Sequence, residues 1–177
     1  MADDPDRRRF LKTATCALGG GLGLVIAAPA LRLCVAPADQ ATVTAPTDPI
    51  DVGDATRLPV GVKWRKLDVV APLVQDAWTS ARDVVLGAAW VRRPGETKLE
   101  ALSATCPHLG CAVGWDESAN NFLCPCHNSR WSNAGELVAG TGPAKRGLDP
   151  LPIEIVDGRL RLTWVRYKLD TADREPA

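Results

Sequence analysis

Two short runs of cysteine and histidine near the middle of the chain carry the side chains best suited to chemistry. The first box reads CPHLGC at residues 106–111, and the second box reads CPCHNS at residues 124–129. Together they contain four of the six cysteines and both histidines of the 177-residue chain. Thiolate sulfur and imidazole nitrogen are common ligands of transition metals. The two boxes therefore predict a metal centre with mixed sulfur and nitrogen ligands.

Dividing the ligands between two iron ions accounts for both residue types. Cys106 and Cys124 would supply thiolates to one iron of a [2Fe-2S] cluster, while His108 and His127 would supply imidazoles to the other iron. A tetrahedral zinc ion is an alternative, because zinc accepts the same kinds of ligand.

Each box contains one more cysteine, Cys111 in the first and Cys126 in the second. A disulfide between them would lock the two ligand loops together. A zinc site does not explain this extra pair, and a scaffold made only of disulfides would leave both histidines idle. These residues therefore favour the iron-sulfur interpretation.

The sequence resembles the Rieske iron-sulfur proteins, specifically the disulfide-bearing branch found in cytochrome bc-type complexes. The resemblance rests on the two boxes, their separation and the extra cysteine in each, and it covers roughly residues 58–168. It implies a mainly β fold, an antiparallel β-sandwich head with the cluster at the tip of two loops. It also implies that His127 hydrogen-bonds quinol and accepts its proton, and that the head passes the electron to a c-type cytochrome.

Some positions depart from the family pattern. In the second box Asn128 replaces a glycine and Trp131 replaces a tyrosine, whereas Ser129 is retained; the family's covering loop GPAP reads GPAK at residues 142–145. The resemblance implies that the Ser129 hydroxyl donates to a cluster sulfide and that the tyrosine donates to a ligand cysteine sulfur. Indole presents its donor at another reach and angle, so we expect the bond to Cys106 to be missing. The cluster potential should then be low within the family range, which suits menaquinol.

The N-terminus predicts export. Residues 6–12 read DRRRFLK, which resembles a twin-arginine export signal with Arg7 and Arg8 as the pair. An ordinary basic signal region is the alternative, and it would also direct export. A disulfide beside metal-binding thiolates fits the oxidising compartment to which such a signal leads.

An uncharged segment at residues 13–31 follows the basic residues. As a helix it nearly spans a hydrocarbon layer of ~30 Å. We predict a cytoplasmic segment at 1–12 and a single-pass anchor at 13–34 in the bacterial inner membrane, with the head on the periplasmic side. The alternative is a cleaved signal, since residues 28–30 read Ala-Pro-Ala.

The segment at residues 35–57 is rich in Ala, Thr and Pro and lacks hydrophobic periodicity, so it predicts a tether. A packed loop is the alternative. The head is assigned to residues 58–177. Cys16 and Cys34 lie outside both boxes and have no assigned role.

Strand patterns dominate the head. Residues 83–91 form an apolar strand-like run, and Asp157-Gly158 separates two alternating segments at 153–156 and 159–164, as in a β-hairpin. Residues 73–82 are predicted to form a short helix or an irregular insert.

The predicted function is that of the iron-sulfur subunit of a quinol:cytochrome c oxidoreductase. The predicted partners are cytochrome b, a c-type cytochrome, menaquinol or ubiquinol, and membrane lipid. The chain has 21 basic and 21 acidic residues, so its net charge implies no nucleic-acid partner. An exported Rieske subunit of a molybdenum oxidase, such as arsenite oxidase, is the main alternative. A cytoplasmic ferredoxin of an oxygenase fits less well, because such ferredoxins lack the cysteine pair and an export signal.

Overall fold

The computed structural model describes residues 5–35, 48–75 and 79–177, which fall into two compact units. One unit is built on the N-terminal helix, and the other contains the sheets of the head. The predicted tether lies mostly at residues 36–47, outside the described residues.

The N-terminal helix α1 spans Pro5–Val35, so the predicted anchor and the basic segment before it belong to one helix. With 31 residues it is about 46 Å long, which exceeds the ~30 Å of a hydrocarbon layer. Its most apolar window has a mean hydropathy of 1.8, and none of its side chains is buried. The helix thus has the length and composition to cross a membrane once.

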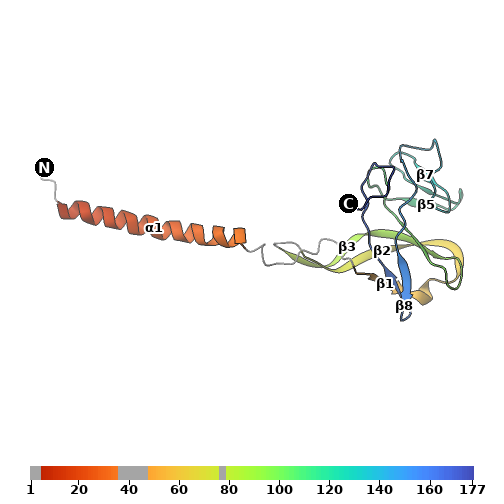
Figure 1. Cartoon of the computed structure of the whole chain (residues 1–177), viewed down its shortest axis with the longest axis horizontal. Coiled ribbons are helices and arrows are strands. Elements are labelled where there is room, and N and C mark those ends of the chain that lie inside the picture. The colour runs from red at the N-terminus through yellow and green to blue at the C-terminus, as the bar shows by residue number, and fades with distance from the viewer. Residues whose placement is uncertain (1–4, 36–47, 76–78) are drawn as a thin grey trace. The chain divides into compact units, whose positions relative to one another are not determined.

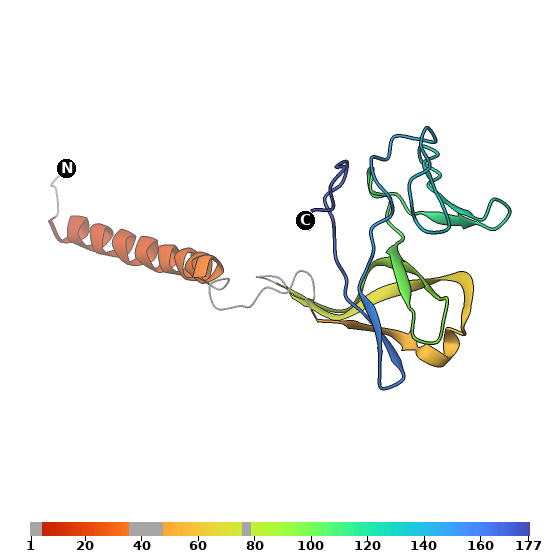
Figure 2. The same cartoon turned by 45° about the vertical axis from the view of Figure 1, so that its right-hand side comes forward.

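The head is mainly antiparallel β-sheet, as predicted (Figures 1 and 2). It has three three-stranded sheets with the strand orders β1-β9-β8, β2-β3-β4 and β5-β6-β7. The strands are β1 Ile50–Asp54, β2 Gly61–Gln75, β3 Ser80–Arg93, β4 Glu100–Ser103, β5 Gly114–Asp116, β6 Asn121–Leu123, β7 Arg130–Trp131, β8 Ile153–Val156 and β9 Arg159–Leu162, with a 3-10 helix at Ala55–Arg57.

The first two sheets share the larger hydrophobic core. Burial alternates along their strands, where the buried residues include Val69, Ala71, Ala89, Val91, Leu160 and Leu162. Such alternation places one face of each strand against the core. These sheets form the base on which the site is built.

The predicted hairpin at Asp157-Gly158 is confirmed: β8 and β9 pair antiparallel on either side of it. Both turn residues have positive φ, +50° for Asp157 and +74° for Gly158, as a two-residue type I′ turn requires.

Two predicted boundaries are corrected. The head begins before residue 58, because Ile50 of β1 is buried and pairs with Leu162 of β9. The composition of residues 35–57 hid this strand, whose partner lies more than 100 residues away. The segment predicted as a helix or insert instead contains the end of β2 at Gln75 and the start of β3 at Ser80. Residues 76–78 lie outside the described residues.

A second, smaller core lies under the two boxes. Phe122 of β6 contacts three tryptophan rings, Trp64, Trp90 and Trp115, at centroid distances of 5.3, 5.8 and 4.8 Å. Aromatic pairs in such tilted or edge-on arrangements add about 0.5–1.5 kcal/mol each beyond the burial of their area. The two boxes that contain the predicted ligands pack on this aromatic cluster.

Candidate metal centre

The first box folds into a tight loop. The Cys106 N–H donates to the Cys111 carbonyl at 2.8 Å, and the Gly110 N–H donates to the Cys106 carbonyl at 2.9 Å. Gly110 has φ +81°, a conformation that glycine adopts at no steric cost. The chain therefore reverses direction between Cys106 and Cys111, with His108 in the bend.

The second box repeats this loop in the same register. The Cys124 N–H donates to the Ser129 carbonyl at 2.9 Å, and the Asn128 N–H donates to the Cys124 carbonyl at 3.0 Å. Asn128 stands at the position equivalent to Gly110 and has φ +60°. Asparagine is among the few non-glycine residues that tolerate this region. The structure thus accounts for the replacement of the family's glycine by Asn128.

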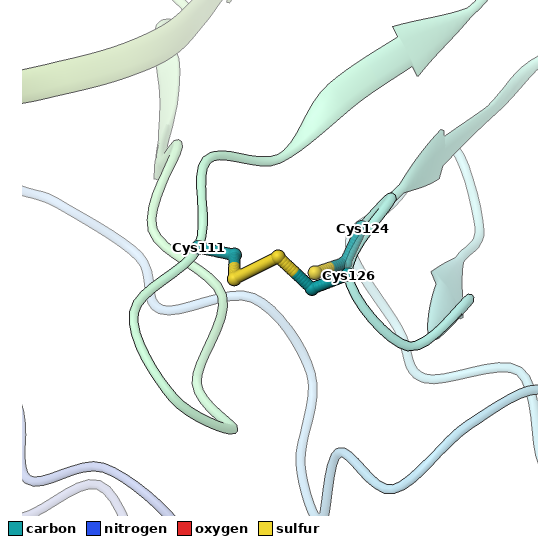
Figure 3. Close-up of side chains that lie close together, drawn as sticks. All are labelled: Cys111, Cys124 and Cys126. Carbon is teal, nitrogen blue, oxygen red and sulfur yellow. A yellow bond between two sulfur atoms is a disulfide. The ribbon is translucent and has the colours of Figure 1, made fainter.

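A disulfide joins Cys111 to Cys126, with the Cα atoms 6.6 Å apart (Figure 3). The Cys124 sulfur lies close by, so that the three sulfurs are within 4.8 Å of one another. Two of them are bonded to each other and cannot act as thiolates, so this group is not a three-cysteine metal site. The disulfide instead ties the two loops together beside Cys124.

The four predicted ligand residues belong to these two loops. Cys106 and Cys124 are each only 1% exposed, and the rings of His108 and His127 are 5.0 Å apart at an interplanar angle of 83°. His108 is half-buried, whereas His127 is exposed. Two buried thiols and two neighbouring imidazoles match the donor set of a Rieske-type [2Fe-2S] cluster.

Burial raises the pKa of the Cys106 thiol to about 11, and the neighbouring Cys124 thiol adds to the rise. The backbone N–H groups of His108 and Leu109 act in the opposite direction, because they donate to the Cys106 sulfur and favour its thiolate. A metal ion deprotonates its thiol ligands. The loop therefore already holds donors that stabilise a bound thiolate.

The loop at residues 142–145 packs tightly on the second box. The Ala144 N–H donates to the buried Ser129 Oγ at 3.2 Å, which leaves the hydroxyl hydrogen free to donate elsewhere. A Cβ on Gly142 would lie 2.5 Å from Ser129 Oγ and 2.7 Å from the His127 carbonyl oxygen. Only glycine fits at this contact.

The indole N–H of Trp131 is bound to a backbone carbonyl. Trp131 is fully buried, and its Nε1–H donates to the backbone carbonyl of Arg146 at 3.0 Å. The single N–H donor of the indole is therefore used by the Arg146 carbonyl. This agrees with the expectation that the bond to Cys106 is missing.

The buried ion pair between Arg146 and Asp149 was not predicted from the sequence. The guanidinium binds the carboxylate through Nε and Nη2 at 2.8 and 2.9 Å, and this hydrogen bonding raises the pKa of Arg146 above its ordinary value. The signal in the sequence was an Arg and an Asp three residues apart directly after the GPAK loop.

Comparison with known proteins agrees with this geometry. The profile of the Rieske [2Fe-2S] domain matches residues 68–153. The menaquinol:cytochrome c reductase iron-sulfur subunit of Geobacillus thermodenitrificans is 34% identical over 88% of this chain and 89% of its own length. The protein of that name from Bacillus subtilis is 31% identical over 93% of this chain and 95% of its own length. The crystal structure of the plasma membrane Rieske protein PetC3 from Synechocystis aligns with 64% of this chain and 97% of its own, at 22% identity and a TM-score of 0.42.

Fold, disulfide and sequence together define an iron-sulfur protein whose cofactor is a [2Fe-2S] cluster. The chain belongs to the Rieske [2Fe-2S] proteins, in the disulfide-bearing branch of cytochrome bc-type complexes.

Proposed function

We propose that this chain is the electron-transfer subunit of a quinol:cytochrome c oxidoreductase and that its quinol is menaquinol. One observation carries the proposal: the likeness to two menaquinol:cytochrome c reductase iron-sulfur subunits extends over about nine tenths of the chain, at 88% and 93% coverage. This likeness includes the N-terminal part of the chain as well as the cluster-binding head. The subunit is not a complete enzyme alone.

In the proposed centre, Cys106 and Cys124 would hold one iron of the cluster, and His108 and His127 would hold the other. The Ser129 hydroxyl would be a hydrogen-bond donor to the bound cluster. When bound, the cluster supplies a one-electron carrier with a potential above that of all-cysteine clusters, because neutral imidazoles replace two thiolates.

His127 is the proposed catalytic residue. Its side chain is exposed, while the two cysteines are buried. An incoming quinol can therefore reach the imidazole and form a hydrogen bond to it. His127 takes the proton of the quinol hydroxyl as the quinol gives up an electron, and the head delivers that electron to a c-type cytochrome.

Leu109 identifies the face that meets the quinol-binding partner. It lies in the first box next to His108, and its side chain is 60% exposed. An exposed apolar side chain next to one of the two predicted histidine ligands suits docking at the apolar rim of a cytochrome b quinol pocket. Cytochrome b would complete the pocket that this chain alone lacks.

The charges around α1 support an orientation in the membrane. Arg7, Arg8 and Lys12 precede the uncharged part of the helix, and this excess of positive charge favours a cytoplasmic N-terminus. We propose that the helix is retained as an anchor and that the head lies on the periplasmic side.

The experiment uses the full chain, tagged and solubilised from membranes with its partners. Co-purification of haem b and haem c, with menaquinol:cytochrome c reductase activity, is the expected result. Co-purification of molybdenum without haem b would instead favour the molybdenum-oxidase alternative and overturn the proposal.

A variant of the docking face sharpens the test. Leu109→Asp should keep the cluster, as judged by the paramagnetic signal of the reduced protein, and lower quinol-dependent activity at least about tenfold. Ile155→Asp is the matched control, because Ile155 of β8 is 38% exposed and lies in the base sheet. Equal activity in the two variants would contradict the assignment of this face.

A further inference from the structure

After β9 the chain leaves the base sheet and returns to the cluster-binding end of the head, as both overall views show (Figures 1 and 2). There the Asp170 N–H donates to the Pro107 carbonyl at 2.9 Å. The side chain of Leu169 lies against Gly110, with Cδ1 3.4 Å from the position of a Cβ on that glycine. Pro107 and Gly110 flank His108 and Leu109, so the C-terminal segment touches the first box on both sides of its bend.

Asp170 also binds the loop at residues 142–145. Lys145 Nζ donates to the Asp170 carbonyl at 3.0 Å and lies 3.0 Å from its carboxylate. Asp170 has φ +56°, in the left-handed region that aspartate tolerates better than most residues with a side chain. Through its bonds to Pro107 and Lys145, Asp170 bridges the first box and the GPAK loop.

Arg146 binds the same C-terminal segment, and all of its N–H donors form hydrogen bonds. Beyond its two bonds to Asp149, Nη1 donates to the Thr171 carbonyl and Oγ1, each at 2.8 Å, and Nη2 donates to the Lys168 carbonyl at 2.9 Å. These five bonds exhaust the five N–H donors of a guanidinium. The Arg146 carbonyl also accepts the hydrogen bond from the indole N–H of Trp131 in β7, the strand directly after the second box. This strand and the C-terminal segment therefore meet at Arg146.

We propose that residues 168–171, called the strap below, are a positioning element of the metal centre. The strap fixes the backbone at Pro107 and thereby sets the position of His108. The strap contacts the first box directly, whereas its link to the second box runs through Lys145 and the GPAK loop. The inference rests on the family's [2Fe-2S] cluster and does not require that quinol be the electron donor.

The strap has its own support, which provides a control. The Lys168 N–H donates to the Glu175 carbonyl at 2.8 Å, and their side chains form an ion pair at 2.7 Å. Removing the Glu175 side chain alters the C-terminal segment without removing a bond from the strap to either loop. Glu175→Ala is therefore the matched control for Asp170→Ala.

The test compares backbone hydrogen exchange in the two boxes of the full-length holoprotein. The amides of Gly110 and Asn128 are equivalent, because each donates to the first cysteine carbonyl of its own box. The variants are a chain that ends at Tyr167, which removes the whole strap, and the milder double variant Lys145→Ala with Asp170→Ala. Leu160→Ala, in the other core, serves as a variant of reduced global stability.

The strap variants should exchange Gly110 at least about tenfold faster and leave Asn128 unchanged, while Glu175→Ala and Leu160→Ala preserve the ratio between the two amides. The cluster should also be lost at least about tenfold faster from the strap variants. With ¹⁵N-labelled histidine, one of the nitrogen couplings to the reduced cluster should shift and the other stay. If both amides accelerate equally, or if neither the Gly110 amide nor the nitrogen couplings change, the strap is only a packed tail and the proposal is wrong.

Discussion

Trp131 stands where the family resemblance predicts a tyrosine that donates to a ligand cysteine sulfur. Its indole donor goes to the Arg146 carbonyl at 3.0 Å and is not available to a ligand sulfur. Hydrogen bonds to cluster and ligand sulfurs stabilise the reduced state and raise the potential. A missing bond therefore lowers the potential, which agrees with menaquinol as the proposed donor.

Restoring the phenol should reverse this effect. Trp131→Tyr is expected to raise the midpoint potential, and Ser129→Ala is expected to lower it, because the first adds a donor near the Cys106 sulfur and the second removes one near the cluster. Redox titration followed by the signal of the reduced cluster measures both. A drop or no change in the tyrosine variant, with the cluster intact, would mean that Trp131 serves packing alone.

At the scale of single residues, the sequence predicts those features of the site that depend only on the types of residue and their spacing. The two boxes, the disulfide partners and the replacements at Asn128 and Trp131 could all be identified from it. The sequence could not show that Asn128 has positive φ, or that Arg146 is buried with all five donors bound. The burial and bonding of Arg146 depend on residues far along the chain, because its partners Thr171 and Lys168 lie 25 and 22 positions away.

The two box loops are elements that share one backbone pattern and one covalent link. The disulfide closes a separation of 15 residues, and a loop of that size corresponds to about 3 kcal/mol in the chain-entropy account. In the native oxidised protein Cys111 and Cys126 should resist alkylation. Reduction, or Cys111→Ala with Cys126→Ala, should accelerate cluster loss, followed by the visible absorbance. If both thiols react readily without reductant, the pairing is wrong.

The pairing of β3 with β4 carries a pH-dependent contribution to stability. A hydrogen bond from Lys98 lowers the pKa of Glu100, and Arg92, its partner across the strands, adds to the effect. A carboxylate with a depressed folded-state pKa stabilises the protein above its unfolded pKa and loses that contribution as pH falls through the folded one. Glu100→Gln should therefore lower the free energy of unfolding near neutral pH. At pH values below the folded-state pKa of Glu100, the substitution should no longer lower it.

Urea unfolding across this pH range provides the measurement. Glu96→Gln is the control, because Glu96 is paired with Arg93 but its side chain is 84% exposed. An unchanged difference between Glu100→Gln and the unaltered protein from neutral to acidic pH would contradict the assignment.

Element prediction succeeded where the signal was local. The turn at Asp157-Gly158 needs two adjacent residues that accept positive φ, and the sequence states both. The strand β1 was missed because, among the described residues, it pairs with β9 far along the chain, and its apolar-polar alternation is confined to the three residues Ile50 to Val52. The strap was missed for the same reason, since its contacts with Pro107 and Lys145 are invisible in its own sequence.

At the scale of the whole molecule, we propose that the chain combines an anchoring helix with an exported head. Arg7→Lys with Arg8→Lys preserves the positive charge before the membrane segment and removes the arginine pair. We expect this variant to retain the head in the cytoplasm, shown by protection from protease added to spheroplasts. Arg9→Lys, beside the pair, should leave export unchanged. Normal export of the double lysine variant would indicate an ordinary basic signal.

The most direct test of the central claim uses the fact that the chain has only two histidines. Protein grown with ¹⁵N-histidine and reduced by one electron should show two strongly coupled nitrogens in pulsed electron paramagnetic resonance. It should also contain two iron and two acid-labile sulfide ions per chain, as a [2Fe-2S] cluster bound by His108 and His127 requires. Iron and sulfide without nitrogen coupling would contradict the histidine ligation, and zinc without sulfide would contradict the cluster itself.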